Sequence, residues 1–124
     1  MEGDVMEEYK LFDAEHKFVS LIWENEPVNS TELVRLCLEK VGWKKSTTYT
    51  VLRKLCERGI LKNEDAVVTS LVKREEVQKY ESEILIEKAF NGSLPQFLIA
   101  FLDGKRLSSK EAAELKIIIE EAIK

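Results

Sequence analysis

The sequence predicts a mostly α-helical protein with a single small β-hairpin. Apolar residues recur three and four positions apart along most of the 124-residue chain, which is the spacing of helices with one buried face. Only residues 60–72 differ, because β-favouring residues there flank the turn-favouring segment Asn63-Glu64-Asp65. Two prolines and five glycines are too few for an all-β protein rich in tight turns.

Two helices are predicted at the start of the chain. Asp13 can cap the first, which ends at Asn25-Glu26-Pro27 because the residue before a proline is disfavoured in a helix. Val28 is predicted to form a short extended step. Asn29 begins a capping-box-like Asn-Ser-Thr-Glu sequence for the second helix, which ends at Gly42.

A third helix and the hairpin follow. Ser46 can cap a helix from Thr47 to Arg58, which Gly59 ends. The segments 60–61 and 67–72 are rich in β-branched and aliphatic residues and form the two predicted strands. This order of helix, short step, two helices and hairpin is the layout of a winged helix-turn-helix domain, which we assign to residues 1–73.

Three short, strongly apolar helices are predicted after the hairpin. The first spans about 74–89, Ser93 and Pro95 open the second, and a capping box from Ser108 to Glu111 opens the third. Because fifty residues rarely bury a sufficient core of their own, we expect residues 74–124 to form a dimerisation domain. The alternative is that they fold back onto the first part as extra core. The residues expected at the dimer interface are Tyr80, Ile84, Phe97, Phe101, Leu115, Ile118, Ile119 and Ala122.

The net charge of −4 hides a local excess of positive charge. Residues 1–34 carry two bases and nine acids, a net of −7, and residues 64–124 carry nine bases and twelve acids, a net of −3. Between them, residues 35–63 carry eight bases and two acids, a net of +6. Since fields act at short range in salt, this basic block can attract phosphate although the whole chain is acidic.

The third helix combines this charge with side chains suited to DNA. Ser46, Tyr49, Thr50 and Arg53 share one face at helical spacing, opposite an apolar face that includes Leu52. Hydroxyl groups can contact phosphates or base edges, and an arginine can bind guanine with two hydrogen bonds. The residues expected to contact double-stranded operator DNA are Lys44, Lys45, Ser46, Thr47, Tyr49, Thr50, Arg53 and Lys54.

Other functional classes find little support in the sequence. No Ser/His/Asp or Cys/His set and no glycine-rich phosphate loop is present, so we expect neither catalysis nor a cofactor. Cys37 and Cys56 lie at apolar helix positions, and His16 is the only histidine, so we expect no metal site. The acidic N-terminus and the lack of a long apolar run predict a cytoplasmic protein without membrane insertion.

The sequence resembles the penicillinase repressor (BlaI/MecI) family of winged-helix transcriptional regulators. The resemblance covers roughly residues 9–123, and each matching piece is short but stands in the same order and spacing. The matching segments are Asp13-Ala-Glu with Ile22-Trp23, Asn29 to Leu33, Ser46 to Leu55, Arg58-Gly-Ile-Leu, Leu71-Val with Glu75-Glu76, Phe90-Asn-Gly-Ser-Leu, Leu107-Ser and Glu114-Leu.

The resemblance implies a dimeric repressor bound to a palindromic operator, and repression that ends when a membrane sensor protease responding to β-lactams leads to cleavage in the C-terminal domain. It places the operator-contacting helix on Ser46, Thr47, Tyr49 and Thr50, and the cleaved bond at Ala100-Phe101. Two features depart from the family. Ala100 replaces the family's asparagine, and the wing, residues 62–68, carries Glu64 and Asp65 where the family has a base near the turn.

An acidic wing would repel phosphate, which leaves a second function open. The chain could be a winged-helix module that binds another protein and no specific DNA sequence. The basic residues around the third helix distinguish the two, because a purely protein-binding version need not keep them.

Overall fold

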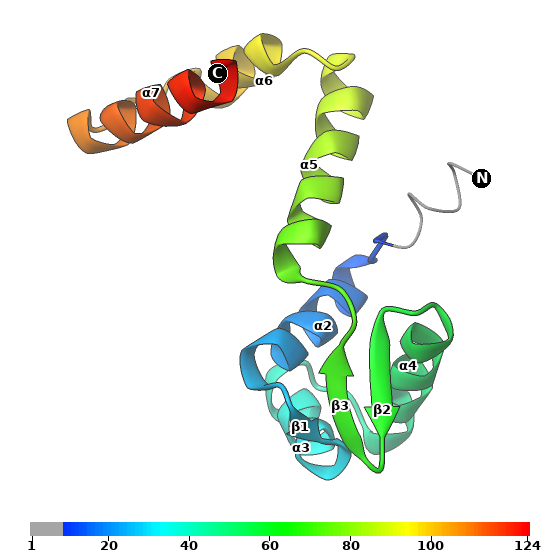
Figure 1. Cartoon of the computed structure of the whole chain (residues 1–124). Helices are drawn as coiled ribbons and strands as arrows, with labels where there is room; N and C mark the ends of the chain where they lie inside the picture. Colours follow the sequence, from blue (N-terminus) through cyan, green and yellow to red (C-terminus); the bar gives the residue numbers. More distant parts are fainter. Residues whose placement is uncertain (1–8) are drawn as a thin grey trace. The chain divides into compact units, whose positions relative to one another are not determined.

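The computed structural model describes residues 9–124, which form six helices and one three-stranded sheet (Figure 1). The predicted fold class, a mostly helical chain with a winged-helix part and three C-terminal helices, is confirmed. The elements in chain order are α2 (Asp13–Asn25), β1 (Val28–Asn29), α3 (Ser30–Lys40), α4 (Lys45–Glu57), β2 (Leu61–Glu64), β3 (Val67–Ser70), α5 (Arg74–Phe90), α6 (Leu94–Leu102) and α7 (Ser109–Ile123).

The sheet is antiparallel, in the order β1-β3-β2. The predicted extended step at Val28 is its third strand, because Val28 pairs with Val68 of the hairpin. The predicted position of the hairpin turn, Asn63-Glu64-Asp65, is wrong. Glu64 still pairs with Val67, so the turn consists of Asp65 and Ala66, which adopt φ values of 51° and 64°. Positive φ values at both central residues are typical of a tight two-residue hairpin turn, whose twist matches that of the flanking strands.

Some of the predicted N-cap residues are confirmed and others are wrong. Asn29 caps α3 by accepting from the Thr31 N–H at 2.8 Å, and Ser108 caps α7, as predicted. Asp13 does not cap α2 but is its first helical residue. The N-cap residue is Phe12, whose N–H donates to the Glu15 carboxylate at 3.0 Å. Ser46 does not cap α4 either, because that helix already begins at Lys45.

A core of aliphatic and aromatic side chains lies between α2, α3, α4 and the sheet. Phe18, Ile22, Leu33 and Leu55 are fully buried within it. The buried carboxylate of Glu15 pairs with Arg58 at 3.2 Å, which ties the start of α2 to the end of α4. Such burial supplies most of the driving force for folding and holds α4 with one face inward.

The two thiols lie at different depths, and each side chain packs in or against this core. Cys37 is fully buried, as predicted, whereas Cys56 is half-buried. Desolvation raises the pKa of both thiols, and for Cys56 the nearby Glu57 adds to the rise. Within residues 9–124, no group of three or more His, Cys, Asp or Glu side chains is placed to hold a metal ion.

The chain divides into two compact units, one up to Ile84 and one from Leu85 to Lys124. The first turns of α5 therefore belong to the winged-helix unit and its last turns to the C-terminal unit. In the C-terminal unit, the Phe97 ring stacks on Phe101, with centroids 5.7 Å apart, and meets Phe90 edge to face, with centroids 5.5 Å apart. None of the helices described by the structure is long and apolar enough to cross a bilayer.

Candidate nucleic-acid interface

Helix α4 presents one face to the core and the other to solvent. Thr48, Leu52 and Leu55 are buried, whereas Ser46, Thr50 and Arg53 are exposed. Before the helix, Trp43 packs on the ring of Phe18 with centroids 5.5 Å apart, which fixes the helix start on the core. The exposed face is therefore presented by a helix that is anchored along its full length.

The structure brings the predicted DNA-contacting residues together on α4 and its first turn. Lys44 is the N-cap residue, and Lys45, Ser46 and Thr47 form the exposed first turn. Thr50, Arg53 and Lys54 continue the exposed surface toward the C-terminal end. The exception is Tyr49, which is half-buried and whose hydroxyl donates to Ser30 Oγ at 3.3 Å. The tyrosine thus links α4 to the start of α3 and presents only part of its ring to solvent.

The N-terminus of α4 is open to an anion. Its cap, Lys44, makes no side-chain hydrogen bond to the first turn, so backbone N–H groups there stay without a helix partner. Ser46 lies inside this turn and therefore cannot supply the cap. Free N–H groups, the helix dipole and two lysines at one end form a favourable environment for a phosphate group.

The basic block contains both free and neutralised side chains. In the described part of the chain, Lys44, Lys45, Arg53 and Lys54 form no ion pair within 4.0 Å. Arg35, by contrast, pairs with both Glu32 and Glu39 on α3. The hydrogen bond from Arg35 lowers the pKa of Glu32, and the same bond raises the pKa of the guanidinium. Glu32 and Glu39 lie three and four residues from Arg35, the spacing at which side chains are neighbours on a helix, so the sequence itself indicates this pairing.

The wing is exposed and mixed in charge at its tip. Residues Lys62 to Ala66 are all exposed, and the Lys62 ammonium lies 3.3 Å from a Glu64 carboxylate oxygen. Asp65 occupies the turn itself, so the outermost part of the hairpin carries negative charge. The positive charge available to a polyanion is concentrated on α4 and not on the wing.

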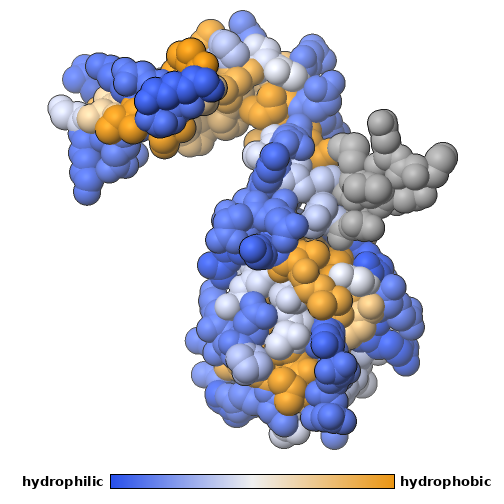
Figure 2. All heavy atoms as spheres, in the orientation of Figure 1, coloured by the Kyte–Doolittle hydropathy of each residue, from blue (hydrophilic) through white to orange (hydrophobic). Residues whose placement is uncertain are grey.

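The C-terminal unit leaves its apolar side chains uncovered in a single chain. No residue of α6 or α7 is buried, and Figure 2 shows hydrophobic surface over both helices. Phe101 is 54% exposed and Ile118 is 62% exposed. Among the other predicted interface residues, Leu115, Ile119 and Ala122 of this unit are exposed and Phe97 is half-buried. Tyr80 and Ile84, which belong to the winged-helix unit, are half-buried as well.

The predicted cleavage site lies in regular structure. Ala100 and Phe101 are both exposed, and both are inside α6. The Lys105 ammonium lies 4.7 Å from the Phe101 ring centroid and donates to the Phe101 carbonyl at 2.7 Å. The bond between the two residues is accessible in one chain but held in a helix.

Comparisons with known proteins agree with this arrangement. Residues 11–121 match the penicillinase repressor family. The chain is 26% identical over 116 residues to the penicillinase repressor of Bacillus licheniformis, covering 90% of this chain and 91% of that protein. It is 22% identical over 117 residues to the methicillin resistance regulatory protein MecI of Staphylococcus aureus, covering 91% and 95%.

A third relative shows that the resemblance extends beyond proteins named for resistance. An uncharacterised 16.5 kDa protein of Latilactobacillus sakei is 26% identical over 110 residues, covering 86% of this chain and 75% of that protein. The family match spans both compact units, including the winged helix and the C-terminal helices. The chain belongs to the penicillinase repressor family of transcriptional repressors.

Proposed function

We propose that this protein is a dimeric repressor that binds a palindromic operator, with one α4 helix in each half-site. The observation that carries the proposal is the exposed face of α4, where Lys44, Lys45, Arg53 and Lys54 form no ion pair within residues 9–124 and surround the hydroxyls of Ser46 and Thr50. Two such helices would enter successive major grooves, about 34 Å apart. The relatives named as penicillinase and methicillin resistance regulators support β-lactam resistance genes as its targets.

We propose that residues 74–124 serve pairing, with a second copy of the chain covering the apolar side chains of α6 and α7. Support comes from the amount of exposed apolar surface, including Ile99, Ile117 and Ile118, each more than 60% exposed. Monomeric proteins rarely expose contiguous apolar patches of this kind. The same apolar residues are expected to become the interior of the dimer interface.

Within α4, we assign the recognition of bases to Arg53 and Thr50. Arg53 is exposed and has no ion pair with any residue that the structure describes, so its guanidinium is available for a bidentate contact. The Thr50 hydroxyl donates to the Ser46 carbonyl at 2.9 Å, so part of its polar capacity is already used within the helix. Its methyl group can contact the methyl group of thymine.

Release of the operator would follow cleavage within the C-terminal unit by a membrane sensor protease. The candidate bond is Ala100-Phe101, which must leave the helical conformation of α6 before a protease can bind it in an extended form. Exposed flexible segments are the usual sites of proteolysis, so local opening of α6 would control the rate.

The experiment that tests the proposal is a gel shift with the DNA upstream of the protein's own gene, at low salt. A discrete shift on a palindromic site is expected, and absence of any shift on that DNA would contradict the proposal. Arg53→Ala is expected to weaken specific binding about 10-fold or more, with a smaller effect on random DNA, since one bidentate contact contributes roughly 1–3 kcal/mol of discrimination. Arg35→Ala is the matched control, because Arg35 is already paired with Glu32 and Glu39.

The acidic wing favours a second candidate function, the binding of a partner protein through the winged-helix unit. The observation is the charge of Glu64 and Asp65 at the tip of the hairpin, which repels phosphate. This function would leave operator binding undetectable and would not require Lys45 or Lys54. The same gel shift therefore distinguishes the two candidates.

A further inference from the structure

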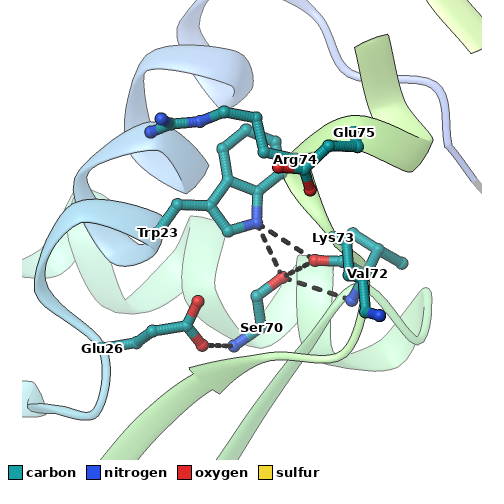
Figure 3. Close-up of a pocket in the computed structure, with 7 residues that line it drawn as sticks. All are labelled: Trp23, Glu26, Ser70, Val72, Lys73, Arg74 and Glu75. Atoms are coloured by element: carbon teal, nitrogen blue, oxygen red, sulfur yellow. Dashed lines mark hydrogen bonds between the residues drawn. The ribbon is translucent and has the colours of Figure 1, made fainter. Parts of the chain in front are cut away.

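The passage from the hairpin into α5 is held by a compact set of hydrogen bonds around Trp23 (Figure 3). The indole Nε1–H of Trp23, at the end of α2, lies 3.1 Å from Ser70 Oγ and 3.1 Å from the carbonyl oxygen of Val72. The partners are 47 and 49 residues further along the chain. A single side chain therefore connects α2 to the segment that leads into α5.

Ser70 is the centre of this set. Its backbone N–H donates to the Glu26 carboxylate at 2.9 Å, and its hydroxyl donates to the Val72 carbonyl at 2.5 Å while accepting from the Val72 N–H at 3.2 Å. A shallow cavity of about 280 Å³ adjoins these residues. Because the indole N–H, the serine hydroxyl and a Glu26 oxygen already have partners, they hold the chain and are not free for a ligand.

The first two turns of α5 are attached to α2 by further contacts. The Arg74 guanidinium lies 5.4 Å from the centroid of the Trp23 ring, within the range of a cation–π contact. One turn later Val77 is fully buried, and after another turn Glu81 Oε1 lies 3.2 Å from His16 Nε2. All of these contacts fall within the compact unit that ends at Ile84.

We propose that Trp23 is a positioning residue for operator recognition: with Ser70 and Arg74 it fixes the direction in which α5 leaves the winged-helix unit, and so the half-site separation that a dimer accepts. The inference rests on the proposed function and names a determinant of its specificity. The part of α5 that belongs to the winged-helix unit runs from Arg74 to Ile84, a length of about 16 Å at 1.5 Å per residue. A change of about 10° at its start would therefore displace the Ile84 end by roughly 3 Å, close to one base-pair step of about 3.4 Å.

The test measures how operator affinity depends on half-site separation. Operators with the native separation and with one or two base pairs added or removed are titrated with the wild-type dimer and with Trp23→Phe. The phenylalanine keeps an aromatic side chain against Arg74 but removes the Nε1–H. Trp43→Phe is the matched control, since the Trp43 ring packs on Phe18 of the core, and the ring and hydrogen-bond contacts found for Trp43 in residues 9–124 do not include α5.

The wild-type protein is expected to lose affinity about 10-fold or more when one base pair is added or removed. Trp23→Phe is expected to reduce that penalty to about threefold or less, with affinity for a single half-site unchanged within about twofold. Trp43→Phe is expected to keep the wild-type ratio of affinity at the native separation to affinity at an altered separation. Ser70→Ala, which removes one acceptor and leaves the indole in place, should shift the ratio in the same direction as Trp23→Phe.

If Trp23→Phe and Ser70→Ala both kept the wild-type ratio of affinities between native and altered separations, the inference would be overturned. An equal loss of affinity at every separation would also overturn it, because that pattern indicates only a smaller folded fraction. A wild-type dimer that binds palindromes but tolerates all separations would refute the positioning role while leaving the proposed function intact. Failure of the wild-type protein on every palindrome would instead refute the proposed function, and this inference with it.

Discussion

The unpaired basic side chains around α4 predict how steeply operator binding depends on salt. Each protomer offers four of them, Lys44, Lys45, Arg53 and Lys54, and with Arg53 assigned to a base a dimer can neutralise about six phosphates. Counterion release then gives a slope of about −5 for log K against log salt concentration. Affinity should fall about 10³-fold when salt rises from 50 to 200 mM. If Arg53 binds a phosphate instead, the slope becomes about −7.

The slope depends on which basic side chains contact phosphate, so it distinguishes the free residues around α4 from the whole basic segment. If every basic residue of the segment 35–63 bound phosphate, about sixteen neutralised phosphates per dimer would give a slope near −14. Arg35 and Lys62 are excluded because carboxylates neutralise them. Fluorescence anisotropy of a labelled operator across a salt series measures the slope directly.

Two substitutions test the assignment behind this slope. Lys45→Ala should make the slope shallower by about 2, because each protomer then neutralises one phosphate fewer, and Arg35→Ala should leave it unchanged. A wild-type slope shallower than about −3 would refute the view that the exposed face of α4 binds the phosphate backbone. An equal effect of the two substitutions would refute the division into free and neutralised side chains.

Three further predictions concern stability and pairing. Leu55→Ala, at a fully buried position, should lower the free energy of unfolding by about 2–5 kcal/mol in a urea titration, whereas Leu38→Ala, at a 60% exposed position, should cost less than about 0.5 kcal/mol. Ile118→Asp should raise the dimer dissociation constant at least about 100-fold in analytical ultracentrifugation, with Lys116→Asp as control; unchanged dimers would remove Ile118 from the pairing surface. Because burial raises the pKa of the Cys37 and Cys56 thiols, both ionise more readily in the unfolded chain, so stability should fall as pH rises above about 9. Replacing both with alanine should remove that part of the alkaline loss, and an identical pH profile would contradict it.

The winged-helix fold was readable from the sequence because its signals are local. Asn29 is a good capping residue at the end of an extended step, and the structure uses it as predicted. The paired spacing of apolar residues in α4 likewise placed Leu52 and Leu55 inward. The extended step at Val28 was also predicted, but its role as a third strand depends on Val68, forty residues later.

What the sequence did not reveal depends on contacts between distant segments. Tyr49 has the spacing of the exposed face, yet the α3 start lies close enough for its hydroxyl to reach Ser30, so the ring is half-buried. The wing turn falls at Asp65-Ala66, although alanine rarely adopts a positive φ, because strand register overrides the turn preference of Asn63. The contact of Trp23 with Ser70 has no sequence signal, since 47 residues separate the two.

The uncovered apolar surface of α6 and α7 has a consequence for how the amount of protein controls the promoter. If a second copy covers Ile118 and its neighbours, as proposed, the paired state forms by mass action, so its population depends on how many chains are present. When pairing is weak, the number of active repressors grows with the square of chain concentration. A twofold change in expression would then change the active population about fourfold, which makes the promoter sensitive to dosage as well as to any inducing signal.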